Sequence, residues 1–525
     1  MISTEPVTPG LIDASAWVAR LAAREERIGL LEEENRWLKS QLFGRSSEKS
    51  AAADISPDQA WLFNEAEALA QAAAIASESV TIPTHERQKR GRKELSADLP
   101  RVEIVHDLPE AEKVCATDGT ALVRIGEQVA EQLDYQPAKL RVLRHIRPQY
   151  ACPCCKMGVH CAPVPVQLLP KSLATPSLLA QITTAKFVDG LPLYRQEAQF
   201  HRLGVPLGRA TMAGWMIKLG ATHVVPIINL LNECLLEAPL IHCDETGLQV
   251  LKSDKAPTSD HWMWVRAAGP PGRRIILFDY DASRGGAVPL RLLQGYRGIL
   301  LTDGYEAYGK VAQTLNIVHA GCLAHARRKF EEARKASAAD GQARVALEFI
   351  RELYRIERSL TDREPPCKPE ERLRVRAEQS ASVMHQFHAW LEVLAPKVLP
   401  QSLLGKAVHY TLGQWPKLSV FLTHADVPLD NNRCENAIRP FVIGRKGWMF
   451  SDTVPGARAS ANLYSLVETA KANGIEPHAY LAHLFERLPF ASNVEDFEAL
   501  LPWNVKSALP TSHLHALAQR KHVVI

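Results

Sequence analysis

The sequence predicts a multidomain α+β protein rather than a chain of one fold class. Three observations lead to this prediction: a seven-residue repeat over residues 11–43, five cysteines between Cys115 and Cys161, and strand-like segments followed by helices from residue 239 onward. The chain has 525 residues, of which 46% are hydrophobic and 23% charged, so it can bury several hydrophobic cores.

Composition argues against two classes of protein. No uncharged apolar run reaches the ~18–20 residues of a membrane span, and the N-terminus lacks a basic start followed by an apolar stretch. We therefore expect a cytoplasmic protein without a membrane partner. Because the net charge is only +4, a polyanionic partner would be bound by local basic patches rather than by the field of the whole protein.

Residues 11–49 are predicted to form a leucine-zipper-like coiled coil that mediates self-association. An inner asparagine in such a repeat fixes the register and a two-stranded state. The alternative is a single amphipathic helix that packs on its own domain. The inner positions of the repeat are Leu21, Arg24, Ile28, Leu31, Asn35, Leu38 and Leu42.

Residues 50–100 are predicted to hold an Ala-rich helix, at about 58–78, and a basic linker. A Lys/Arg run that contains glycine can follow a phosphate backbone or enter a minor groove of DNA. It can equally be a solvated linker with no partner. The basic side chains are Arg87, Lys89, Arg90, Arg92 and Lys93.

Residues 101–165 are predicted to form a small zinc-binding-like module with β-type segments, for example at 140–146. Cys152 and Cys155 have the spacing of a zinc half-site, whereas the first half-site pairs Cys115 with a carboxylate, Asp118. We expect a structural Zn²⁺ here, and a metal-free module held by packing is the alternative. Other donors that could replace Asp118 are His106, Cys154 and His160.

Residues 170–235 are predicted to be helical, with a turn at Leu203-Gly204-Val205. Two helices joined by a glycine-containing turn match the outline of a DNA-reading helix-turn-helix. A packed helical hairpin has the same outline, so the pattern leaves both interpretations open.

Residues 236–450 have the pattern of a ribonuclease-H-like α/β core. Three hairpin-linked strands, a helix and then an apolar parallel strand are the order of such a sheet. A helical insertion is predicted at about 336–412, and a helical C-terminal segment at 451–525. The expected strands lie at 239–250, 261–268, 274–280 and 298–302, and the helix at 287–294.

Three acidic residues are placed where this core would bring them together. Asp244 lies in the first strand, Asp303 at the end of the apolar strand, and Glu435 in a helix that should begin near Asp430-Asn431-Asn432. Two Mg²⁺ or Mn²⁺ ions need carboxylates from different elements. Each residue has another interpretation: Asp303 as a turn former, Glu435 as a surface partner of Arg439, and Asp244 as a buried charge paired elsewhere.

Several long motifs, which are spread over nearly the whole chain, resemble those of the insertion-sequence-66 family of bacterial transposases. The resemblance implies the acidic triad Asp244, Asp303 and Glu435, and it implies that Cys115, Cys152 and Cys155 are zinc ligands. Cys322 and His325 resemble a Cys/His signature of triad transposases; they could hold the turn beside the site, or offer two ligands to a metal. The matching segments are 42–49, 244–246, 302–305, 322–330, 428–440, 443–450 and 464–474.

The function that we expect is therefore metal-dependent cleavage of DNA at the ends of an element, followed by strand transfer into target DNA in the bacterial nucleoid. Accessory proteins of the same element are an expected partner. The alternatives are a DNA-binding regulator with an inactive core and a nuclease that does not join. The residues expected to contact phosphates beside the triad are Arg327, Arg328, Lys329, Arg439, Arg445 and Lys446.

Overall fold

The chain was analysed as a computed structural model. It describes residues 163–336, 341–363 and 367–505, together with shorter stretches at 23–25, 27–32, 34–36, 38–39, 140–147, 149–151 and 159–161. Two compact units are present: one comprises residues 1–64 and 164–525, and the other residues 65–163.

The described residues between 23 and 39 are helical, as the heptads predict. In the smaller unit, strands β1 (Gln149–Ala151) and β2 (Val159–Cys161) form an antiparallel pair on either side of Cys152 and Cys155. The prediction of a β segment at 140–146 is wrong, because residues 140–147 have no regular secondary structure. All eight of these residues are exposed, so their alternating pattern has no buried face.

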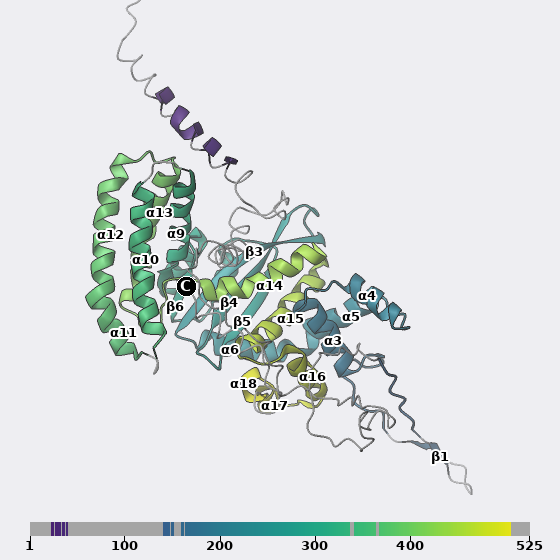
Figure 1. The fold of residues 1–525 in the computed structure, drawn as a ribbon. Coiled ribbons are helices and arrows are strands. Elements are labelled where there is room, and N and C mark those ends of the chain that lie inside the picture. Colours follow the sequence, from purple (N-terminus) through teal and green to yellow (C-terminus); the bar gives the residue numbers. More distant parts are fainter. Residues whose placement is uncertain are drawn as a thin grey trace, which may run out of the picture. The chain divides into compact units, whose positions relative to one another are not determined.

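A mixed sheet forms the centre of the larger unit (Figure 1). Its order is β5-β4-β3-β6-β7, and β8 pairs with the far end of β3. Strands β3, β4 and β5 are antiparallel neighbours, whereas β6 and β7 run parallel to β3. The four predicted strands are confirmed within a few residues. The strands are β3 (Leu240–Lys252), β4 (Asp260–Ala268), β5 (Ile275–Asp281), β6 (Ile299–Thr302), β7 (Val318–Gly321) and β8 (Ser451–Thr453).

Helices from both ends of the larger unit share one hydrophobic core with this sheet. Before the sheet come α3 (Pro176–Phe187), α4 (Leu193–Arg202), α5 (Arg209–Lys218), a π-helical turn (Leu219–His223) and α6 (Val225–Leu236). Between its first five strands lie α7 (Ala287–Leu292) and α8 (Glu306–Leu315), and α9 (Leu323–Ala336) follows β7. α14 (Asn432–Trp448) precedes β8, and after β8 come α15 (Val454–Ala472), α16 (Pro477–Arg487), α17 (Val494–Ala499) and α18 (Pro502–Val505).

No single helix among the described residues has the length and apolar composition of a membrane span. The bent pair formed by residues 209–223 and 225–236 passes that test by length and composition. Its side chains Met212, Trp215 and Leu231 are part of the hydrophobic core around the sheet.

The described residues between 341 and 418 are mostly helical and form a bundle that stands beside the sheet (Figure 1), where the sequence predicts an insertion at about 336–412. Its helices are α10 (Gly341–Thr361), α11 (Pro369–Val375), α12 (Ala381–Leu394) and α13 (Leu403–Leu418), and α9 packs with them. The bundle has its own core, in which Phe387 contacts the rings of Phe349, Trp390 and Trp415.

Polar side chains of α15 cover the free edge of β5. The hydroxyl of Thr469 accepts from the N–H of Ile276 at 3.0 Å and donates to its carbonyl at 2.9 Å. One turn later, Asn473 likewise accepts from the N–H of Arg274 and donates to its carbonyl, and one turn earlier the hydroxyl of Ser465 accepts from the N–H of Phe278 at 2.8 Å. The helix therefore replaces a missing strand, because buried backbone groups at a sheet edge need partners.

Replacing Thr469 with valine should test this substitution of a helix for a strand. Thr469→Val keeps the shape but leaves the N–H and carbonyl of buried Ile276 unpaired, so we expect the free energy of unfolding to fall by about 2 kcal/mol. Thr314→Val is the control, since Thr314 is exposed and its hydroxyl bonds only the preceding turn of α8. Equal urea midpoints for Thr469→Val and the wild type would contradict the assignment.

Candidate functional site

Asp244 and Asp303 come from neighbouring parallel strands. The register of β3 against β6 pairs His242 with Leu301, and its continuation by two residues sets Asp244 beside Asp303. A carboxylate oxygen of Asp244 accepts from the N–H of Glu245 at 2.8 Å, and one of Asp303 accepts from the N–H of Tyr305 at 2.9 Å. Both side chains therefore have fixed directions, Asp244 within β3 and Asp303 directly after β6.

Gly304 after Asp303 is explained by packing rather than by turn geometry. A Cβ atom at this position would lie 2.6 Å from the ring of Tyr410, which reaches over from α13. A larger residue would therefore displace the Tyr410 ring. The Asp-Gly pair is thus placed at the contact between the sheet and the bundle.

Glu435 lies in the first turn of α14 and is buried, with 5% of its surface exposed. Burial raises the pKa of the Asp244 carboxyl group well above its usual range, and the negative charges of Glu245, Asp303 and Glu435 raise it further. The charges of Asp303 and Glu435 therefore both act on Asp244, although the three acids come from separate elements. Like charges gathered in this way are costly unless a cation or proton neutralises them, so the donor set fits an oxygen-binding divalent ion.

Asn431, the residue before α14, joins the elements that carry these acids. It is fully buried, and its side chain accepts from Nδ1 of His242 at 3.0 Å and donates to the carbonyl of Cys243 at 2.9 Å. Its backbone N–H donates to Sγ of Cys322 at 3.2 Å, and its carbonyl accepts from the N–H of Glu435. Asn431 occupies the N-cap position of α14, but its side chain makes no capping bond to that helix.

Glu245 belongs to a second network beside the site. Its side chain, 1% exposed, accepts two hydrogen bonds from Arg284, at 2.8 and 3.0 Å, and one from the hydroxyl of Tyr308 at 2.6 Å. The Arg284 guanidinium lies over the rings of Trp262 and Tyr305. The sequence analysis missed Arg284, since no local pattern links the loop after β5 to β3.

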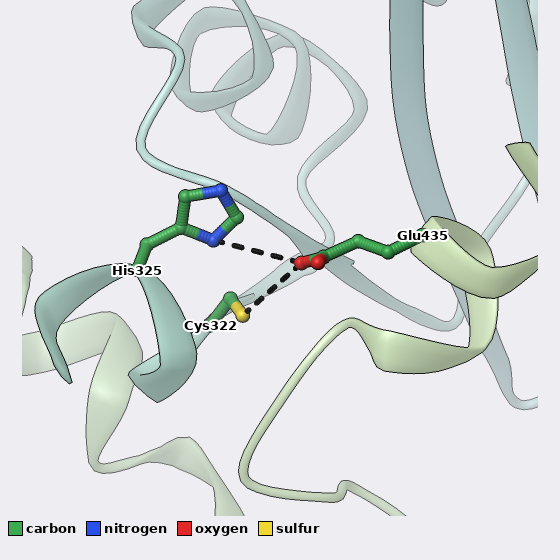
Figure 2. A group of neighbouring side chains, drawn as sticks. All are labelled: Cys322, His325 and Glu435. Carbon is green, nitrogen blue, oxygen red and sulfur yellow. Dashed lines mark hydrogen bonds and ion pairs between the residues drawn. The ribbon is translucent and has the colours of Figure 1, made fainter. Parts of the chain in front are cut away.

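Cys322 and His325 lie at the start of α9 and face Glu435 (Figure 2). The sulfur of Cys322 is 3.9 Å from Oε1 of Glu435, and Nδ1 of His325 is 3.8 Å from the same oxygen. Oε2 of Glu435 faces the guanidinium of Arg328 at 3.7 Å. The Cys/His motif and the third predicted acid, far apart in sequence, therefore meet.

The larger part of the chain matches a known protein family. The family described as "Transposase IS66 family" matches residues 171–459, and the "IS66 C-terminal element" matches residues 465–503. The chain belongs to the IS66 transposase family. Among its relatives is the uncharacterized protein y4jD of Sinorhizobium fredii, 35% identical over 79% of this chain and 82% of the relative. Another is y4qI of the same organism, also uncharacterized, 33% identical over 94% of this chain and 93% of the relative.

Two more family matches cover the N-terminal part of this IS66 chain. The "zinc-finger binding domain of transposase IS66" matches residues 112–156, which include Cys115, Asp118, Cys152 and Cys155. The family "Transposase C of IS166 homeodomain" matches residues 30–104, which include the basic run from Arg87 to Lys93. All of these side chains lie outside the described residues, so their contacts remain predictions.

The basic residues predicted near the triad differ in their surroundings. Arg327 and Lys446 are exposed. Arg445 instead donates to the carbonyl of Gly247 in β3, and the ammonium of Lys329 lies 4.8 Å from the centre of the Tyr410 ring. Arg439 is partly buried, and its Nε atom has no hydrogen-bond partner. The structure therefore leaves Arg327 and Lys446 as the most accessible of this set.

Asn431→Ala should test whether this side chain stabilises the fold through its bonds to β3. Removing the amide leaves Nδ1 of His242 and the carbonyl of Cys243 without partners in a buried region, so we expect a loss of about 2–4 kcal/mol in unfolding free energy. Asn432→Ala is the matched control, because Asn432 is exposed at the next position. Similar thermal midpoints for the two variants would contradict the proposed role of Asn431.

His319 on β7 should make the fold sensitive to acid. Burial, and then the charge of Lys417, lower its pKa to about 4, below the ordinary value of 6.5. Between pH 6.5 and about pH 4, His319 is therefore protonated in the unfolded chain but neutral in the folded chain. The free energy of unfolding consequently falls as the pH falls through this window.

The expected loss from this one group is about 2 kcal/mol between pH 7.5 and pH 5. His319→Gln can keep the hydrogen bond to the hydroxyl of Thr302, which lies 2.9 Å from Nε2, but cannot titrate. Urea unfolding at the two pH values should show a smaller pH effect in the variant. An identical pH effect in both proteins would rule out this assignment.

Proposed function

We propose that this chain is a DNA transposase that cleaves a phosphodiester at transposon ends and then joins the freed 3′-hydroxyl to target DNA. The observations that support it most are the membership in the IS66 family and the three acids from separate elements, of which Asp303 and Glu435 both raise the pKa of Asp244. The strand order β5-β4-β3-β6-β7, with three antiparallel strands followed by parallel ones, supports a ribonuclease-H-like core.

Asp244, Asp303 and Glu435 would hold two Mg²⁺ or Mn²⁺ ions. Such ions, when bound, lower the pKa of an attacking water or hydroxyl and stabilise the leaving oxygen. The protein's own contribution is to fix the carboxylates: Asn431 sets the start of α14, and the N–H groups of Glu245 and Tyr305 orient the two aspartates.

Exposed basic side chains would position the DNA. Arg327 on α9 and Lys446 in the last turn of α14 are exposed and would contact phosphates, where charge supplies affinity but little choice of sequence. The basic run from Arg87 to Lys93 and the cysteine module would add contacts to the transposon ends. The zinc-finger family match supports DNA-end binding by this N-terminal part.

Self-association through residues 11–49 would bring two DNA ends together. The described inner side chains Ile28, Leu31 and Leu38 are 55%, 41% and 42% exposed, which leaves an apolar stripe for a second copy of the helix. Accessory proteins of the same element are a further partner that we propose from the family resemblance.

Asp244→Asn, Asp303→Asn and Glu435→Gln should each abolish cleavage and joining of a DNA substrate that carries the transposon ends. Loss of a metal ligand removes several kcal/mol of transition-state stabilisation, so we expect rates to fall by at least about 1,000-fold while DNA binding persists. In the presence of a chelator, Asp244→Asn should also raise the melting temperature, because it removes one of the mutually repelling charges.

Asp452→Asn is the matched control, since Asp452 is an exposed carboxylate paired with Lys252. It should cleave and join at the wild-type rate. Full activity in any of the three site variants would remove that residue from the triad. Cleavage by the wild type without joined products would identify a nuclease instead.

A further inference from the structure

We propose that Cys322, His325 and Glu435 bind one transition-metal ion of the Zn²⁺ class, and that this ion competes with the triad for the Glu435 carboxylate. One sulfur, one imidazole nitrogen and one carboxylate oxygen from these residues lie within 4.8 Å of one another. Figure 2 shows the ring and the sulfur directed at the carboxylate from one side.

Geometry supports a shared ion rather than a chance meeting of polar groups. A tetrahedral Zn²⁺ with bonds of about 2.0–2.3 Å separates its ligand atoms by about 3.3–3.7 Å. The observed distances from Oε1 to Sγ and to Nδ1 are 3.9 and 3.8 Å, so small side-chain movements would close the site. Cys322 and His325 are three residues apart at the start of a helix, which puts both on one side of the turn.

The imidazole gives an independent reason to expect a ligand. Nδ1 of His325 is buried and makes no hydrogen bond, although it faces Glu435. A buried polar atom without a partner costs free energy, and a metal ion would satisfy it. The sulfur of Cys322 already accepts the N–H of Asn431 at 3.2 Å, the kind of outer contact that orients a metal ligand.

The donors select the metal. Sulfur and imidazole favour Zn²⁺, Co²⁺ and related ions, whereas Mg²⁺ prefers oxygen alone. Arg328 faces Oε2 of Glu435, so Oε1 is the oxygen directed at the proposed ion. Three protein ligands would leave the fourth position of a tetrahedral ion to water.

The competition rests on the proposed function, whereas the metal binding itself does not. Oε2 of Glu435 faces Arg328, which leaves Oε1 for a metal ion, and this one oxygen cannot point both at an ion beside Cys322 and at an ion beside Asp244. Zinc bound at the Cys/His side would therefore inhibit chemistry that depends on Mg²⁺, and removal of zinc by a chelator would restore it.

Cobalt titration of the full-length protein, stripped of metal, tests the binding. Co²⁺ bound to a thiolate has a characteristic absorption. The cysteine module at 101–165 is the same in all proteins compared, so it contributes the same absorption to each of them. Cys322→Ser and His325→Asn should each weaken one cobalt site by about 100-fold or more, because loss of an outer partner alone costs about 10–100-fold. Cys367→Ser is the control, since this thiol bonds only the neighbouring backbone carbonyl of Lys368.

Glu435→Gln keeps the shape of the side chain, so it tests the metal site even if Cys322→Ser or His325→Asn misfolds. It should also weaken this cobalt site. If all three variants bind the same number of Co²⁺ ions as the wild type, with the same affinity and absorption, the proposed site does not exist.

A second measurement tests the competition. Zn²⁺ added at fixed Mg²⁺ should inhibit DNA cleavage by the wild type, and Cys322→Ser should need a higher Zn²⁺ concentration for the same fractional inhibition. Equal sensitivity of the two proteins would overturn the competition. A chain that shows no cleavage with any divalent ion would refute the proposed function, while the cobalt titration would still decide the metal site.

Discussion

The buried side chain of Asn431 is the contact on which the arrangement of the site depends. It bonds β3 through His242 and Cys243, while its backbone bonds Cys322 before α9 and starts the helix of Glu435. Three segments far apart in the sequence are therefore fixed by one residue. Because each bond is buried, a small displacement would leave a polar group unpaired, and this cost keeps the acids in place.

Electrostatics oppose this arrangement in the absence of a cation. Burial and neighbouring negative charges both raise the pKa of Asp244, and the Arg284 guanidinium is already bonded to Glu245. The fold therefore holds acids together at a cost in stability, as is common where binding or catalysis requires it. Glu435 faces the softer donors Cys322 and His325, and its negative charge also raises the pKa of Asp244.

The C-terminal part of the chain is integral to the sheet that carries the acids. Ser465 and Thr469 on α15 and Asn473 at its end recur every four residues and bond the backbone of Phe278, Ile276 and Arg274, alternate residues in and just before β5. This regular match explains the polar residues of the segment 464–474 in physical terms. The edge of the sheet is thereby closed, which protects it from pairing with another chain.

The sequence by itself determined the secondary structure, the insertion and the identity of the donor groups, because strand alternation, helix periodicity and Asp, Cys and His chemistry are local properties. The local pattern failed at 140–146, where alternation without a buried face made no strand. Only the tertiary structure decided that Glu435 meets Cys322, 113 residues earlier, and that Asn431 bonds β3 instead of capping its own helix. Such contacts depend on how the helices and strands pack against one another. The spacing of residues along the chain does not indicate which distant groups this packing brings together.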